Sequence, residues 1–304
     1  MVGADPGPVE LGGPWTHRMV AANGARFHVA TLGTGPLVLL LHGFPQFWWA
    51  WRHQLEGLAA AGFRAAAMDL RGYGGSDKPP RGYDPFTLCA DVSGVIRSLG
   101  EREAAVVGHG LGGLLAWTLP VLQPNEIRRV AVLSAPHPRR LRASGRNLQQ
   151  LYASRHIVAF QRPWAPEKSL TRDDGALVER LIRGWSGPGW PDEEASARYR
   201  AAIQVPGVAH SAMEFYRWSV RSLPRPDGLR YAAAMKAPVR VPVLLLHGEC
   251  DPAIHVRTTA GSGDYVAAAY RSRLLPDVGH FPHEERPDVT TRELVDFLAP
   301  DLSA

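Results

Sequence analysis

A short stretch at residues 106–115, V-V-G-H-G-L-G-G-L-L, constrains the fold of this chain more than any other. Val106 and Val107 form a β-branched run that is typical of a buried strand. The apolar segment from Leu111 to Trp117 is typical of a helix. Glycines at positions 108 and 112 allow the backbone to turn sharply and the two elements to approach closely. The sequence therefore predicts a strand, a tight turn and a helix.

Further apolar runs alternate with helical patterns, which predicts a doubly wound, mostly parallel α/β sheet. The expected strands are residues 25–31, 36–41, 63–70, 104–108, 129–134, 241–246 and 272–278, and the expected helices are residues 47–61, 86–99 and 287–298. Between Arg139 and Lys236 apolar residues recur only at helical spacing. We therefore predict a core domain over residues 15–138 and 237–304, a helical insertion over 139–236, and an apolar pocket between them.

Composition narrows the classes of protein that this chain can belong to. Of its 304 residues, 45% are hydrophobic and 21% are charged, which is typical of a globular protein. The sequence contains no run of eighteen apolar residues, so it predicts no membrane span. Cys89 and Cys250 form no disulfide framework, and no leader is apparent, so we expect a reduced, cytoplasmic protein. We expect a monomer or a homodimer.

The net charge of +5 is carried mostly by arginine. A cluster at Arg139, Arg140, Arg142 and Arg146 would suit an anionic partner such as nucleic acid or a membrane. No aromatic-interleaved nucleic-acid motif accompanies it, so we interpret the cluster as a solvated surface. We expect a small apolar ligand or substrate, no nucleic acid and no membrane as partners.

Two polar residues follow predicted strands at the sheet edge where α/β proteins bind ligands, namely Asp251 and His280. An acid beside a histidine fixes the imidazole tautomer and makes it a usable general base. Glu249, His283 and Glu284 are nearby in sequence, and we expect them at the surface. The twelve histidines show no metal-ligand spacing, so we expect no metal and no cofactor.

The pattern at 108–112 resembles the nucleophile elbow of the α/β-hydrolases. Two further motifs are similar to the epoxide hydrolases of that superfamily, to which haloalkane dehalogenases are related. They are His42-Gly-Phe-Pro, followed by Trp51-Arg52-x-Gln54, and the run from Asp69 to Pro79. The resemblance extends from about Trp15 to the C-terminus and is weakest over residues 139–200. It implies an α/β-hydrolase fold in which the insertion is a helical cap domain.

The resemblance also implies roles for individual residues. The backbone N–H groups of Phe44 and Leu111 would form an oxyanion hole. Tyr216, in Glu-Phe-Tyr-Arg, matches one of two cap tyrosines that hydrogen-bond the epoxide oxygen. The second tyrosine usually lies four residues before a Phe-Gln pair, and His156 stands there as a different donor. His280 and Asp251 would activate water to hydrolyse an alkyl-enzyme ester.

The nucleophile position departs from this pattern, because it is occupied by Gly110, which has no side chain that could attack. Three interpretations stay open: an enzyme whose activity rests on a His280–Asp251 base, a non-catalytic relative that binds a ligand or partner, or a nucleophile-to-glycine variant of an active epoxide hydrolase or esterase. The residues expected to line the substrate pocket are His42, Trp48, His109, His156 and Phe281, with Trp49 and the oxyanion-hole and cap residues beside them.

Overall fold

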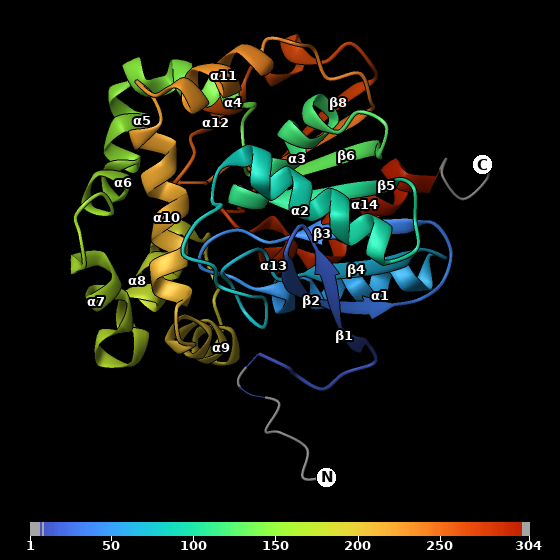
Figure 1. Ribbon diagram of the computed structural model, residues 1–304, viewed down its shortest axis with the longest axis horizontal. Coiled ribbons are helices and arrows are strands. Elements are labelled where there is room, and N and C mark those ends of the chain that lie inside the picture. Colours follow the sequence, from blue (N-terminus) through green and yellow to red (C-terminus); the bar gives the residue numbers. More distant parts are fainter. Residues whose placement is uncertain (1–6, 8, 300–304) are drawn as a thin grey trace.

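The computed structural model describes residue 7 and residues 9–299, and its centre is a twisted sheet (Figure 1). The strands are β1 (Thr16–Ala22), β2 (Ala25–Leu32), β3 (Leu37–Leu41), β4 (Arg64–Met68), β5 (Ala104–His109), β6 (Ile127–Leu133), β7 (Val243–Gly248) and β8 (Tyr270–Leu275). Within the described residues their spatial order is β1-β2-β4-β3-β5-β6-β7-β8. The pairs β1–β2 and β2–β4 are antiparallel, and the other pairs are parallel.

Helices cover both faces of the sheet. The core helices are η1 (Trp48–Trp51), α1 (Arg52–Ala60), α2 (Pro85–Ser98), α3 (Gly110–Leu122), α12 (Val256–Thr259), η4 (Ser262–Tyr265), α13 (Pro282–Glu285) and α14 (Pro287–Leu298). Helices α2 and α3 pack together in front of the sheet in Figure 1, and α1 packs against α14 behind it. The α/β-hydrolase architecture predicted from the sequence is confirmed.

The helical insertion follows β6 and ends before β7. Its helices are α4 (Pro138–Ala143), η2 (Ser144–Arg146), α5 (Leu148–Ala153), α6 (Arg155–Ala159), α7 (Ala165–Thr171), η3 (Arg172–Gly175), α8 (Ala176–Trp185), α9 (Glu193–Gln204), α10 (Val208–Arg221) and α11 (Pro226–Ala234). Figure 1 shows most of them gathered at one side of the sheet, on the left of the view. No described residue between 139 and 236 lies in a strand. The division into two domains stays a prediction.

Strand β1 was not among the predicted strands. It lies at the edge of the sheet, and only Val20 and Ala22 of its seven residues are buried, so its sequence contains no apolar run. The helix expected over residues 47–61 consists of the 3₁₀ turn η1 followed by α1. No helix in the described part of the chain combines the length and the hydropathy needed to cross a bilayer.

Candidate active site

The turn between β5 and α3 has the geometry of an elbow. Gly110 adopts a φ of +52°, a backbone conformation that side chains disfavour. The flanking glycines allow close approach: a Cβ at Gly108 would lie 2.1 Å from the Gly112 carbonyl oxygen, and a Cβ at Gly112 would lie 2.2 Å from that of Leu41. A Cβ at Gly110 meets no such obstacle, since its nearest neighbour would be His280 Nε2 at 3.5 Å.

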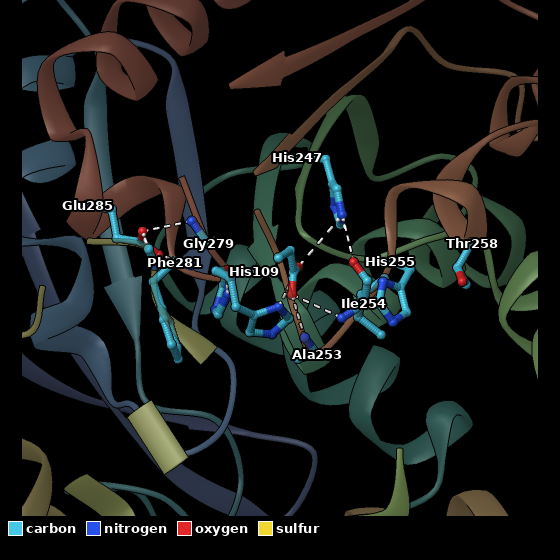
Figure 2. A network of polar contacts seen from close by, with 12 residues as sticks. His109, His247, Ala253, Ile254, His255, Thr258, Gly279, Phe281 and Glu285 are labelled. Atoms are coloured by element: carbon cyan, nitrogen blue, oxygen red, sulfur yellow. Dashed lines mark hydrogen bonds and ion pairs between the residues drawn. The ribbon is translucent and has the colours of Figure 1, made fainter. Parts of the chain in front are cut away.

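The imidazole of His280 is held by a buried carboxylate. Its Nδ1 lies 2.8 Å from Asp251 Oδ2, and the other carboxylate oxygen accepts the backbone N–H groups of Ala253 at 2.8 Å and Ile254 at 2.9 Å (Figure 2). His247 Nε2 donates to the Ile254 carbonyl at 2.8 Å. Because Nδ1 donates to Asp251, His280 in its neutral form carries a lone pair on Nε2, on the side that faces Gly110.

The backbone on both sides of His280 is also fixed. Its N–H donates to the Trp185 carbonyl at 2.8 Å, and its carbonyl accepts His109 Nε2 at 2.8 Å. Glu285 accepts the N–H groups of Gly279 at 2.7 Å and Phe281 at 2.9 Å, as Figure 2 shows. Since Trp185 ends α8, the helical insertion contributes directly to the position of this histidine.

The loop after β3 is held in place by Asp69, the first residue of the Asp69–Pro79 run. Its carboxylate accepts the N–H groups of Trp48 at 2.8 Å and Gly75 at 2.9 Å, and lies 2.9 Å from His28 Nδ1. Burial opposes the charged form, but the hydrogen bond with His28 and the charges of nearby histidines lower the pKa of Asp69. This run therefore acts on the site by supporting the loop that carries Phe44.

A cavity of about 110 Å³ lies against the elbow. It is lined by Phe44, Gly110, Leu111, Leu114, Ser134, Ala135, Pro136, Leu141, Ser154, His156, Ile157, Trp185, Tyr216, Ala253, Ile254 and His280. Core and insertion both contribute to this lining. The structure thus brings together the expected base, the two expected oxyanion residues and the two expected cap residues, with Asp251 directly behind His280.

Four residues expected in the pocket lie elsewhere. Trp48 is fully buried, and its Nε1 donates to the Val9 carbonyl. His42 Nε2 accepts the N–H of Leu70 at 3.0 Å, so this ring supports the loop from below. His109 and Phe281 are also fully buried and lie side by side behind His280. These residues pack beneath the site instead of lining it, which corrects the expectation for all four. The candidate Trp49 packs under the Arg52 guanidinium and is likewise absent from the lining.

Tyr216 of α10 and His156 of α6 face each other across the cavity, with ring centroids 6.1 Å apart. Burial raises the pKa of Tyr216, so its hydroxyl stays protonated. Burial lowers the pKa of His156 to about 4, so this ring is neutral near pH 7. His156 Nδ1 donates to the Ala153 carbonyl at 3.0 Å, which leaves Nε2 without a proton. His156 is therefore an acceptor, and its expected role as a donor is corrected.

Ser134 is a residue of the site that sequence reasoning missed. It follows β6, and the register pairs His109 with Leu133, so Ser134 lies beside Gly110 at the ends of neighbouring strands. Its φ is +52°, and its side chain is fully buried. Its Oγ has no hydrogen-bond partner within the described part of the chain. In the sequence, the only feature that could have indicated Ser134 as a site residue was its position at the end of a predicted strand.

His283 and Glu284 were expected at the surface, and both are buried. Glu284 accepts a hydrogen bond from the Tyr199 hydroxyl and pairs with Arg52 Nη1 at 2.7 Å. Burial raises the pKa of Glu284 to about 7 although Arg52 works in the opposite direction. Partners on other elements make this burial possible, and local sequence does not reveal them.

Comparison with known proteins agrees with this geometry. The Alpha/beta hydrolase family matches residues 38–293 of the chain. Epoxide hydrolase 3 of Xenopus tropicalis is 33% identical over 92% of this chain and 76% of its own length. Epoxide hydrolase A of Mycobacterium tuberculosis is 31% identical over 95% of this chain and 98% of its own length. The crystal structure of epoxide hydrolase A from Mycobacterium thermoresistibile superposes with a TM-score of 0.81 at 29% identity, over 94% of this chain and 98% of the other.

Proposed function

Because this chain belongs to the alpha/beta hydrolase family and its relatives include epoxide hydrolases, we propose that it opens small apolar epoxides without a covalent bond to the protein. The attacking group would be a water molecule that the His280–Asp251 pair activates directly. One observation carries this proposal: the space over Gly110, which a nucleophilic side chain would fill, is within contact distance of His280 Nε2. A water molecule in this space would lie beside the base.

The proposed reaction uses the protonation states derived above. His280 Nε2 takes a proton from water as the water oxygen bonds to an epoxide carbon and the carbon–oxygen bond of the ring breaks. Asp251 stabilises the imidazolium that forms. The Tyr216 hydroxyl donates its proton to the departing oxygen, and the proton on His280 then returns to the tyrosinate through solvent. The net reaction adds one water to one epoxide.

A second candidate function is ligand binding without turnover, which the absence of a side chain at Gly110 also favours. Loss of the nucleophile removes covalent catalysis, which splits one difficult step into two easier ones. The binding function predicts that an epoxide or glycol occupies the cavity and leaves unchanged. Cytoplasmic location and a monomeric or dimeric state stay predictions.

Turnover of an epoxide panel by the wild type and by His280→Ala separates these functions. Catalysis by a base predicts slow hydrolysis that falls by about 10²-fold or more in His280→Ala, since general-base catalysis contributes about this much. His210→Ala, which removes a half-exposed histidine of α10, is the matched control and should keep the wild-type rate. Hydrolysis equal in wild type and His280→Ala would refute the proposed base, and tight binding without hydrolysis would favour the second function.

A further inference from the structure

We propose that the space over Gly110 binds a small free carboxylate, such as acetate or formate, and that this carboxylate replaces the missing side chain as the nucleophile toward epoxides. The inference rests on the proposed function and names a co-substrate for the same site. It follows from what surrounds Gly110: an open space of side-chain size, an imidazole nitrogen and a hydroxyl that both lack a partner among residues 7 and 9–299, and the first turn of a helix.

The space over Gly110 would hold a carbon atom without a clash. A Cβ built on Gly110 would have two heavy-atom neighbours within 4 Å, namely His280 Nε2 at 3.5 Å and Gly43 Cα at 3.8 Å. Both distances are ordinary van der Waals contacts. A free carboxylate is not bonded to Gly110 and must keep van der Waals distance from its Cα, so it would lie farther into the cavity, where the end of a longer side chain would reach.

Two buried polar side chains of this cavity have an atom without a hydrogen-bond partner among the described residues. The His280 side chain is 9% exposed; its Nδ1 is bound to Asp251, whereas its Nε2 is unpartnered. Ser134 lines the same cavity, and its Oγ is a free donor. Leaving such groups unsatisfied is costly. A carboxylate would accept a hydrogen bond from Ser134 Oγ, and it would accept one from His280 Nε2 when this ring is protonated.

The backbone favours an anion at the same place. Leu111 is the second residue of the thirteen-residue helix α3, where N–H groups have no acceptor within the helix and the helix dipole attracts negative charge. No carboxylate of the described chain belongs to the cavity lining, whereas Asp251 lies behind His280 and would balance a protonated ring. A small carboxylate therefore fits the charge of the site as well as its space.

The chemistry proceeds in two balanced steps. A carboxylate oxygen bonds to an epoxide carbon, the ring carbon–oxygen bond breaks, and the alkoxide takes the Tyr216 proton. The proton on His280 then returns to the tyrosinate through solvent, which leaves His280 neutral. This step gives a hydroxyalkyl ester. In the second step His280 takes a proton from water, the resulting hydroxide adds to the ester carbonyl, and the glycol leaves with that proton. The carboxylic acid that remains passes its proton to His280, which restores the carboxylate and the protonated ring. The glycol keeps one oxygen atom that came from the carboxylate.

Isotope transfer tests this sequence on the wild-type protein. Styrene oxide is incubated with the protein in unlabelled water with increasing ¹⁸O-labelled sodium acetate. We expect a saturable acceleration of about tenfold, as covalent catalysis is restored, and ¹⁸O in the glycol or in a released hydroxyalkyl acetate. Pivalate, which has the same charge and a bulky tert-butyl group, is the matched control and should give neither effect.

Two variants localise the effect. Gly110→Ala places a methyl group in the space, so it should abolish acceleration by acetate. Ser134→Ala removes the free hydroxyl and should raise the acetate concentration that gives half-maximal acceleration several-fold. Unaltered acceleration and labelling in both variants would overturn the assignment of the carboxylate to this space.

The result without acetate distinguishes this inference from the proposed function. His280-dependent hydrolysis that acetate neither accelerates nor labels would overturn the carboxylate site and leave the proposed function standing. Absence of epoxide consumption with and without acetate would overturn both. His280-dependent hydrolysis without acetate, together with acceleration by acetate and label in the product, would support both.

Discussion

At residue scale, Gly110 combines an unusual backbone with a missing function. A residue with a Cβ at φ +52° costs about 1–3 kcal/mol of strain, which glycine avoids. Glycine at this position also has no side-chain atom that could attack a substrate. Asp251 is bound to His280 next to Gly110, and Tyr216 lines the same cavity. The site is therefore consistent with chemistry in which the nucleophile comes from outside the chain.

Tyr216 is the proposed donor to the epoxide oxygen, because neutral His156 has no proton to give from Nε2. We predict that Tyr216→Phe lowers kcat/KM for epoxides about 10²-fold, the usual contribution of a positioned acid. Its effect on ester hydrolysis should be small, since the oxyanion of an ester would be held by backbone N–H groups. Parallel assays with styrene oxide and phenyl acetate measure this difference.

Tyr152→Phe is the matched control for Tyr216→Phe, because Tyr152 is 69% exposed on the outer side of α5. It should leave both rates unchanged. Equal losses of epoxide and ester activity in Tyr216→Phe would mean that Tyr216 shapes the cavity instead of donating a proton.

At the scale of elements, α13 joins the core to the insertion through buried polar contacts. Glu284 of α13 binds Tyr199 of α9 and Arg52 of α1, and His283 Nε2 lies 3.2 Å from Gln46 Oε1. His283 also packs against His109, with ring centroids 4.5 Å apart. This cluster therefore couples the position of α9 to the residues directly behind the elbow.

Stability should depend on pH through Glu284. The pKa of its carboxyl is about 7 in the folded protein, against an ordinary value of 4.5. The folded state thus binds more protons between these values, so the free energy of unfolding falls as pH rises from about 4.5 to 7. The contribution amounts to about 3 kcal/mol, given 1.4 kcal/mol per pKa unit. Urea unfolding of Glu284→Gln should show a weaker decline over this range than the wild type.

Glu249→Gln is the control for this comparison, since Glu249 is exposed. Its pH profile of stability should follow that of the wild type. A profile of Glu284→Gln parallel to that of the wild type across pH 4.5–7 would contradict the elevated pKa.

At the scale of the whole molecule, features carried by one continuous segment were predictable from sequence. The apolar runs of β3, β5 and β7 predicted buried parallel strands, and strand ends predicted Asp251 and His280. Features that depend on distant partners were not. Whether Trp48 lines the cavity or packs beneath it depends on where residues 9–28 lie. The burial of Glu284 requires its partners Tyr199 and Arg52. The position of Ser134 next to Gly110 can be recognised only when β6 is known to pair with β5.

We propose that no oxygen atom of the protein enters the product. A single turnover in H₂¹⁸O tests it, with protein in excess over styrene oxide and no carboxylate in the buffer. The claim predicts that the first glycol formed by the wild type carries one ¹⁸O from solvent. Gly110→Asp, which supplies a carboxylate nucleophile, should release unlabelled glycol in its first turnover. Unlabelled glycol from the wild type, confirmed by an ester adduct in intact-mass spectrometry, would contradict the claim and identify a nucleophile within the chain.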